Sequence, residues 1–314
     1  MPMIRFSIII TSYNQREFIK DAVDSALVQR TAEKEIIVVD DASTDGTQEI
    51  LRQYGDAIRL VCRETNGKCS VARNCGAALA RGEYLVFLDG DDALLPWALD
   101  VYEQIVEAKT PKMIVASLRH FKGTLPAPQA GHGPRTIRIV EYADYLRKDR
   151  TAASSASAMV IERRVFERVG GWPEDIWPMA DHDFVLKLGD CGRMVLILTP
   201  LTILYRVHAQ NTVHNVPAYL PSVQAVIRNE RLGKYPGGKH RRFERRALIG
   251  GYALTWAAKA IKRGLWWDAL KLTANIWPMA LAAVTRKLRV RLKGRQGPET
   301  IEMPMGWSSG GQRP

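Results

Sequence analysis

The chain has few cysteines and lacks long apolar segments. The four cysteines, Cys62, Cys69, Cys75 and Cys191, form no Cys-x-x-Cys pair and match no zinc-binding or redox spacing. The first residues lack the apolar core and small-residue cleavage site of a signal peptide. No apolar run reaches the roughly 20 residues that a membrane span needs. We therefore expect free thiols and a cytoplasmic protein.

Excess positive charge is missing from most of the chain. The net charge is +12, yet the segment from Arg228 to Arg295 alone has 18 Lys and Arg against 3 Asp and Glu. The remainder is slightly acidic, which argues against a uniformly nucleic-acid-binding surface. No nucleic-acid recognition motif accompanies the basic segment. We expect no nucleic-acid partner.

Strand and helix signals alternate over the first 90 residues. Short β-branched runs predict strands at Phe6–Thr11, Glu35–Val39, Ile58–Cys62 and Tyr84–Leu88. Amphipathic or small-residue segments between them predict helices. This order predicts an α/β fold with a parallel, doubly wound sheet, in which ligands bind at the carboxyl ends of the strands. Polar residues occupy those ends: Thr11–Asn14, Asp40–Asp41 and Asp89–Asp92.

The chain changes character twice after this region. Residues 1–215 read as one catalytic α/β domain, although the signals become less regular after residue 95. Residues 216–294 read as a basic helical region that contains Trp256, Trp266, Trp267 and Trp277. Residues 295–314 are rich in Gly, Pro and Ser and predict a disordered tail.

The segment Asp89-Gly90-Asp91-Asp92 follows a predicted strand directly. Crowded carboxylates repel one another, so a cation is expected to compensate them. Hard oxygen ligands suit Mg²⁺ or Mn²⁺, which keep waters and recruit substrate phosphates. A solvated turn is the alternative reading of these four residues, but their place at a strand end favours a metal site.

A second acidic segment runs from Asp40 to Thr47. A carboxylate at a strand end can accept the imide N–H of uracil, and we assign that role to Asp41. The following Ser43 and Asp45 are typical residues for capping a helix. Both readings are compatible.

Together, these segments resemble a known family. The chain is similar to the inverting family 2 glycosyltransferases of the GT-A fold, a Rossmann-like mixed sheet flanked by helices. The matching segments occur in the family's order: Ser7–Asn14, Val39–Thr47, Asn66-Gly67, Ala72–Gly76, Phe87–Asp92, Phe166–Trp172, Ala180–Asp183 and Tyr205–Asn211.

The resemblance implies a role for each matched position. Thr11, Tyr13 and Asp41 would line the nucleobase and ribose pocket, and Arg73 and Arg206 would lie near the diphosphate or the donor sugar. Asp91 would bind the metal directly, whereas Asp89 would reach ribose or the metal through water. His208 would be a further metal ligand or diphosphate contact. A histidine ligand would favour Mn²⁺ over Mg²⁺.

Asp181 is the candidate general base. An inverting transfer needs one carboxylate to accept the proton of the acceptor hydroxyl as that hydroxyl attacks the donor sugar. A helix start favours the ionised form of Asp181, with helix capping as its alternative role and Asp183 as the rival base. The family often has Glu-Asp at this place, whereas this chain has Ala180-Asp181.

Aromatic residues flank the candidate base. Trp172 and Trp177 could stack on the sugar rings of an acceptor, and Asp183 could contact it, although core packing explains the tryptophans equally well. The Gln-x-x-Arg-Trp motif and the several membrane spans of the processive members are missing. We therefore expect one sugar to be added per encounter.

The basic helical region suggests an anionic membrane surface as a partner. Basic residues next to tryptophans suit the interface of such a membrane, and contact with its inner face would suit a lipid-linked glycan acceptor. The alternative is a helical hairpin on the catalytic domain with a solvated basic face.

The sequence thus predicts a metal-dependent, inverting, non-processive glycosyltransferase. Its donor would be a nucleoside-diphosphate sugar, with UDP as the expected nucleotide, and its acceptor a hydroxyl of a glycan or lipid-linked glycan. One alternative is a non-catalytic sugar-nucleotide-binding protein. Another is a nucleotidyltransferase, which would need a Gly-rich basic loop after the first strand that Ser12–Phe18 does not provide.

Overall fold

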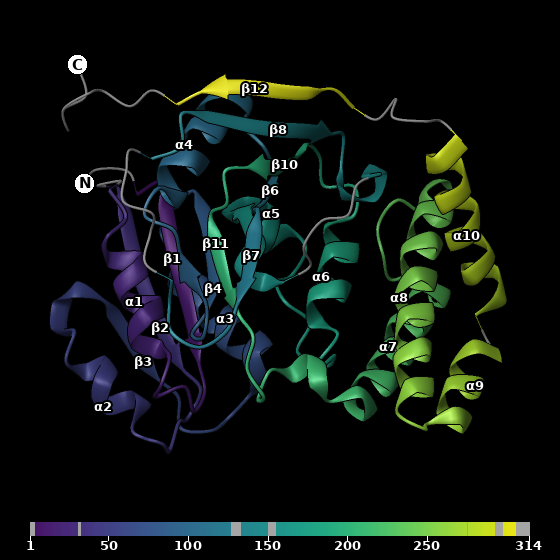
Figure 1. Cartoon of the computed structure of the whole chain (residues 1–314), viewed down its shortest axis with the longest axis horizontal. Helices are drawn as coiled ribbons and strands as arrows, with labels where there is room; N and C mark the ends of the chain where they lie inside the picture. The colour runs from purple at the N-terminus through teal and green to yellow at the C-terminus, as the bar shows by residue number, and fades with distance from the viewer. Residues whose placement is uncertain are drawn as a thin grey trace.

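A computed structural model gives the arrangement of most of the chain. It describes residues 4–30, 33–126, 133–149, 155–274, 276–292 and 298–305. One mixed sheet with helices on both sides forms the body of the molecule, and four long helices gather at one side of it (Figure 1). In the described part of the chain, no helix has the length and apolar character needed to cross a membrane.

Nine strands form the main sheet in the order β12-β8-β10-β6-β9-β4-β1-β2-β3. The four strands expected from the first 90 residues are parallel neighbours at one end of it, in the order β4-β1-β2-β3. Their bounds are β1 (Phe6–Ser12), β2 (Lys34–Asp40), β3 (Arg59–Cys62) and β4 (Tyr84–Asp89). The predicted parallel arrangement of this part is confirmed.

The rest of the sheet is mixed. The strands β6 (Met113–Val115) and β10 (Met194–Thr199) are parallel to each other, whereas β9 (Met159–Glu162) runs antiparallel to β4 and β6. Strand β8 (Thr136–Tyr142) pairs antiparallel with β10. It was not predicted, although its buried residues alternate with exposed ones over most of its length.

The expected disorder of residues 295–314 is wrong for part of that segment. Thr300–Pro304 forms β12, which pairs antiparallel with β8 along the edge of the sheet, and the side chain of Met305 is buried (Figure 1). The apolar residues Ile301 and Met303 pack against the core, which offsets the entropy lost on ordering. Residues 295–297 and 306–314 lie outside the described parts.

A small second sheet stands beside the main one. Strand β11 (Ile203–Arg206) lies between β5 (Ala93–Leu94) and β7 (Leu118–Phe121), antiparallel to the first and parallel to the second. This sheet brings the end of β11 next to the loop after β4. Segments over 100 residues apart in the chain therefore meet there.

Helices cover both faces of the sheet and extend beyond it. Before residue 215 they are α1 (Ile19–Leu27), α2 (Thr47–Arg52), α3 (Lys68–Leu79), α4 (Ala98–Lys109), α5 (Arg163–Arg168) and α6 (Ala180–Leu188). The later helices are α7 (Val216–Arg231), α8 (Arg242–Lys262), α9 (Trp266–Ala274) and α10 (Trp277–Leu292). Short 3₁₀ turns are η1 (Gly55–Ala57), η2 (Tyr145–Arg147), η3 (Ala156–Ala158), η4 (Thr212–His214) and η5 (Lys239–Arg241).

The helical region after residue 215 shares a core with the rest of the chain. Residues of α7 to α10 pack in one cluster with Leu146, Ile176, Met179 and Leu186. Leu186 belongs to α6 and Met179 immediately precedes it, so the helix of the candidate base rests on the C-terminal helices. The division at residue 215 remains a prediction.

Candidate functional site

A cleft of about 760 Å³ opens at the carboxyl ends of β1, β2 and β4. Residues from the start of α3, the start of α6, the segment after β11 and helix α7 also line it. Nine of the predicted site residues contribute to its walls: Thr11, Tyr13, Asp41, Arg73, Asp89, Asp91, Trp177, Asp181 and His208. Sequence reasoning thus located the cleft and most of its polar side chains.

Asp41 lies in the wall of this cleft with most of its side chain covered. Its carboxylate pairs with Arg63, and the backbone N–H of Gly67 lies 3.1 Å from each carboxylate oxygen. Because a carboxylate offers about four acceptor positions, one remains for a further donor. Tyr13 is half exposed at the same end of the cleft.

Asp40 and the following polar residues stabilise the turn behind Asp41. The Ser43 backbone N–H donates to Asp40 at 2.9 Å, and Asp45 accepts the backbone N–H of Thr47 at 3.0 Å. Asp45 therefore satisfies a donor in the first turn of α2, whereas Gly46, with φ of 94°, is the residue before the helix. The expected N-cap position of Ser43 or Asp45 is therefore wrong, since Gly46 occupies it, although Asp45 still accepts a backbone N–H of the first turn.

Arg73 of α3 connects two of the cleft's carboxylates. Its guanidinium lies 2.6 Å from an Asp89 oxygen and 3.2 Å from an Asp181 oxygen, and it stacks 4.7 Å from the centre of the Trp172 ring. The side chain is 5% exposed. The charge of Asp89 is therefore compensated by an arginine, whereas the sequence suggested a metal cation.

Asp181 lies in the first turn of α6, as predicted. The N-cap residue of the helix is Met179, and the Asp181 carboxylate accepts from Arg73, so the alternative role as a helix cap is not observed. Burial raises the pKa of its carboxyl to about 6, while Arg73 opposes the rise. A carboxylate with a pKa near neutrality can accept a proton in one step and release it later.

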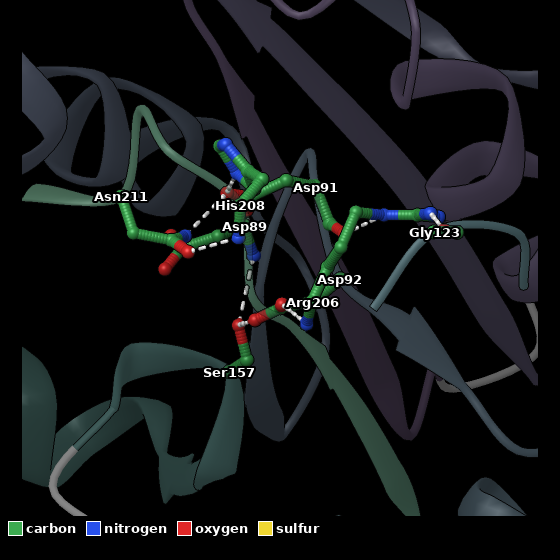
Figure 2. A network of polar contacts seen from close by, with 8 residues as sticks. All are labelled: Asp89, Asp91, Asp92, Gly123, Ser157, Arg206, His208 and Asn211. Atoms are coloured by element: carbon green, nitrogen blue, oxygen red, sulfur yellow. Dashed lines mark hydrogen bonds and ion pairs between the residues drawn. The ribbon is translucent and has the colours of Figure 1, made fainter. Parts of the chain in front are cut away.

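Asp91 and His208 face each other across the join between the two sheets. His208 Nε2 lies 2.8 Å from an Asp91 carboxylate oxygen, and the Asn211 amide donates to the same oxygen at 3.4 Å (Figure 2). Asn211 also accepts the backbone N–H of His208 at 2.6 Å, which fixes the turn after β11. The Tyr-Arg-x-His-x-x-Asn spacing signalled this arrangement, although we had assigned no role to Asn211.

Gly90 permits the two acidic residues around it to lie at one place. A Cβ at this position would fall 2.3 Å from Gln15 Oε1 and 3.0 Å from the Thr11 carbonyl oxygen. The Gly90 N–H donates to that Thr11 carbonyl at 2.9 Å. The glycine is thus required by the close approach of two backbone segments.

Asp92 is fully buried beneath the cleft and was not predicted. It accepts the Arg206 backbone N–H at 2.9 Å and the Ser157 hydroxyl at 2.6 Å, while Ser157 accepts the Asp89 N–H at 3.0 Å (Figure 2). Burial, followed by the charges of Asp91 and Asp89, raises the pKa of its carboxyl well above the ordinary value. Asp92 fixes the backbone that presents the other two carboxylates.

The placement of Arg206 corrects the expectation that it touches the donor. Its buried guanidinium donates to the carbonyls of Asp91 and Gly123 (Figure 2). It also pairs with Asp21 of α1. The rings of Phe18 and Phe121 lie 4.7 and 4.6 Å from it. Because each of its three nitrogens has a partner and it does not line the cleft, Arg206 is a clamp on the Asp91 loop.

Two of the three candidate acceptor residues are also corrected. Trp172 is buried in the core and stacks on Phe184 at 4.0 Å, so its packing role is the one observed. Asp183 is fully buried and accepts from Tyr235 and Asn229. It lies two residues after Asp181 and therefore points about 200° away from it around the helix. Trp177 does line the cleft, with the Lys68 ammonium 4.5 Å from its ring centre.

Sequence reasoning missed several wall residues, some from unmatched segments and some from matched segments in which no role had been assigned to them. They are Asn66, Lys68, His120, His182, Gln210 and Tyr219. His182 lies next to Asp181 with its ring 4.2 Å from that of Tyr252 on α8, and burial lowers its pKa to about 4. The local sequence does not indicate a neutral imidazole beside the candidate base, because the Tyr252 ring that packs against His182 is 70 residues away in the chain.

The donor set around Asp91 fits a divalent metal that a substrate completes. No group of three or more His, Cys, Asp or Glu side chains stands ready for a metal in the described ranges. Mg²⁺ and Mn²⁺ sites, however, commonly use one or two protein ligands together with substrate phosphates and waters. Asp91 and His208 supply a carboxylate and an imidazole, and the buried His208 Nδ1 has no partner among the described residues.

Comparison with protein families supports the reading of the sequence. The model of a family described as Glycosyl transferase family 2 matches residues 7–170, just over half of the chain. The putative teichuronic acid biosynthesis glycosyltransferase TuaG of Bacillus subtilis is 44% identical over 104 residues, which is 32% of this chain and 40% of that protein.

A second curated relative has a more specific name. The UDP-Glc:alpha-D-GlcNAc-diphosphoundecaprenol beta-1,3-glucosyltransferase WfaP of Escherichia coli is 43% identical over 88 residues, which is 27% of this chain and 35% of that protein. The chain therefore spans less than half the length of each of these two relatives.

Solved structures share the fold over nearly the whole chain. Residues 1–349 of S. aureus TarS, in complex with UDP-GlcNAc, align with a TM-score of 0.62 at 16% identity, covering 94% of this chain and 92% of that one. The mannosyltransferase PcManGT of Pyrobaculum calidifontis, in complex with GDP-Man and Mn²⁺, aligns with a TM-score of 0.54 at 19% identity, covering 90% and 87%. The predicted GT-A fold is confirmed.

Proposed function

Because the chain belongs to glycosyl transferase family 2, we propose that it moves a sugar from a nucleoside-diphosphate sugar to a hydroxyl group, with inversion at the anomeric carbon. The donor we propose is a UDP-sugar. The observation that carries this proposal is the geometry of Arg73, which joins Asp89 at the end of β4 to Asp181 at the start of α6. A proton acceptor and a phosphate-handling centre thereby border one cleft.

Asp181 is the proposed general base. With its pKa raised by burial to about 6, its carboxylate is ionised at neutral pH yet basic enough to accept the proton of an acceptor hydroxyl. The Arg73 guanidinium holds this carboxylate within the cleft. Asp183, the rival, is directed into the core by Tyr235 and Asn229 and is not part of the proposed chemistry.

Asp91 and His208 are the proposed ligands of a divalent metal, Mn²⁺ or Mg²⁺. When bound, such an ion neutralises charge that develops on the departing diphosphate. The protein's part is to hold the two ligands, through Asn211 on His208 and through the Arg206 clamp on the Asp91 carbonyl. Asp89, already paired with Arg73, is the proposed ribose contact.

The nucleotide is proposed to bind where Thr11, Tyr13 and Asp41 line the cleft. Tyr13 offers an exposed aromatic face for stacking, and Asp41 retains a free acceptor position for the imide N–H of uracil. Both residues follow the carboxyl ends of parallel strands, where ligands of such sheets bind.

A glycan or lipid-linked glycan is the proposed acceptor. The WfaP name describes transfer to a sugar carried on diphosphoundecaprenol, and the Trp177 ring in the cleft wall suits the apolar face of a sugar. One sugar would be added per encounter, because the chain lacks the Gln-x-x-Arg-Trp motif of processive relatives.

The proposal is tested by measuring UDP release from a panel of UDP-sugars with Mn²⁺, with Mg²⁺ and after chelation. We expect release with metal and its loss after chelation, and the donor should raise the melting temperature of the protein when metal is present. Asp91→Asn should lose the UDP release that metal supports, whereas Val28→Ser, at an exposed site outside the cleft, should retain this release. Binding of UDP-sugars without any turnover would instead indicate a non-catalytic sugar-nucleotide-binding protein.

A further inference from the structure

Helix α10 has an exposed apolar stripe on the side opposite its packing face. Trp277, Leu281, Val284, Leu288 and Leu292 are between 47% and 85% exposed. Their spacing of three or four residues places them on one face of the helix. The opposite face carries the buried residues Met279, Ala282 and Ala283. The exposed stripe therefore belongs to a helix whose opposite face is packed against the rest of the molecule.

The attachment of α10 to α8 is tight and specific. Gly250 of α8 lies so close to α10 that a Cβ there would fall 2.1 Å from the Met279 carbonyl oxygen. Arg286 of α10 donates to the carbonyls of Leu146 and Lys148 in the catalytic domain. These contacts fix which face of α10 points outward, and α10 is the outermost of these helices in Figure 1.

Helix α9, which precedes α10 in the sequence, has two exposed tryptophans. Trp266 and Trp267 are 64% and 76% exposed, and Leu270 on the same face is 56% exposed. Buried Ala269 and Leu272 attach the other side of α9 to the core. Most of the exposed large apolar side chains of the described residues thus belong to α9 and α10.

Basic side chains flank these apolar residues. Lys271 on α9 and Lys287, Arg289 and Arg291 on α10 are all exposed. In the part of the chain that the structure describes, Lys271, Lys287 and Arg291 make no ion pair. One acidic residue, Asp268, lies in these two helices.

We propose that the exposed apolar and basic residues of α9 and α10 form a docking face for an anionic membrane surface. The apolar stripe and the tryptophans would enter the boundary between headgroups and acyl chains, where tryptophan is favoured. The flanking basic side chains would meet anionic headgroups, each contributing attraction that salt screens. A second copy of the chain fits less well, because face-to-face pairing would oppose like charges.

Membrane docking by this face does not depend on the transfer reaction. The face is formed by residues outside the cleft walls, so a chain without turnover should still bind lipid. For a lipid-linked acceptor, docking would hold the enzyme at the surface where that acceptor lies.

The test is sedimentation of the full chain with lipid vesicles that contain no acceptor. We expect binding to vesicles of phosphatidylcholine and phosphatidylglycerol in equal amounts, and little binding to pure phosphatidylcholine. High salt should weaken the binding. The stripe variant Trp277→Ser/Leu281→Ser should bind at least about tenfold more weakly, because two large side chains no longer leave water on docking.

A matched control removes two equally exposed apolar side chains elsewhere. Val28→Ser/Leu232→Ser, at sites 58% and 65% exposed, should bind vesicles like the parent chain. Both double variants should retain UDP release from a donor. The proposal is overturned if the parent chain stays in solution with anionic vesicles, or if the stripe variant binds as well as the parent. It is also overturned if the parent forms a stable dimer without lipid that the stripe variant abolishes, since a second copy would then cover the face.

Discussion

Arg73 is the side chain on which the charge balance of the cleft depends. It is almost fully buried, and its guanidinium neutralises Asp89 while holding Asp181 at 3.2 Å. A buried arginine with two carboxylate partners is stabilised by both, and the removal of any one group leaves uncompensated charge. The electrostatics of the proposed base and of the nucleotide pocket are therefore linked through one residue.

The first prediction concerns the pH dependence of donor turnover. Burial raises the pKa of Asp181 to about 6, and only the ionised carboxylate can accept a proton. The value of kcat/KM should therefore rise as pH increases through about 6 and be lost below it. Because Arg73 lowers this pKa, Arg73→Gln should move the acidic limb to higher pH. A limb that stays in place in Arg73→Gln would contradict the assignment.

The second prediction separates a clamp from a donor contact at Arg206. Arg206→Met keeps much of the side-chain volume but leaves Asp21 unpaired and the carbonyls of Asp91 and Gly123 without their donor. We expect the free energy of unfolding in urea to fall by about 1–3 kcal/mol, because two carbonyls lose their donor while Asp21, at 36% exposed, can be hydrated. The loss of UDP affinity with Mn²⁺, measured by calorimetry, should be smaller than in Asp91→Asn. A loss of UDP affinity larger than in Asp91→Asn, at unchanged stability, would show direct donor contact.

Residue types and spacings predicted much of the cleft but not the direction of each side chain. Asp181 and Asp183 are two residues apart on one helix, yet one borders the cleft and the other is buried beside Tyr235. Arg206 is the last residue of β11 and His208 lies two residues after it, and only His208 reaches the cleft. Such differences depend on the packing of remote segments, which local sequence does not encode.

At the scale of elements, α6 is held from two sides. Its first turn faces the cleft, while Asp183 on its other side is bound by Asn229 of α7 and by Tyr235 in the segment between α7 and α8. His182 packs its ring against Tyr252 of α8. The C-terminal helices therefore position the helix that carries the proposed base.

The third prediction tests this positioning. Tyr235→Phe removes the hydroxyl that donates to the buried Asp183 carboxyl, so the free energy of unfolding should fall by about 1–3 kcal/mol. We expect kcat to fall while the KM for the donor changes little, because the proposed nucleobase site lies at the ends of β1 and β2. Urea denaturation and steady-state kinetics would measure both effects. Unchanged kcat despite lower stability would indicate that Tyr235 is only structural.

Strands were predicted well where they form short β-branched apolar runs, even at the edge formed by β3, and poorly in β8 and β12. The four parallel strands came from runs such as Ile8–Ile10 and Val38–Val39, whose side chains are fully buried. Strand β12 has glutamate and proline among its five residues, a composition typical of a loop. Its pairing with β8, more than 150 residues away, and the packing of Ile301 and Met303 against the core stabilise it as a strand.

On the scale of the whole molecule, the mixed sheet brings distant residues into one cleft. Asp89 and Asp91 lie at and after the end of β4, and His208 follows β11 of the second sheet. Asp181 lies on α6, which packs on the C-terminal helices. The ordered motifs predicted this convergence, because each follows a strand or begins a helix. Basic residues and tryptophans in the sequence indicated the proposed docking face on α9 and α10. Which of these side chains are exposed depends on the packing of α10 against α8.

The central claim is that Asp181 accepts the proton of the acceptor hydroxyl. The most direct measurement is sugar transfer by Asp181→Asn, compared with Asp183→Asn, once a donor and an acceptor have been identified. We predict that Asp181→Asn lowers kcat by about 100-fold or more, with UDP affinity retained, whereas Asp183→Asn lowers stability and lowers kcat far less, because its amide oxygen can still accept from Tyr235. Transfer by Asp181→Asn at the rate of the unmodified chain would contradict the account.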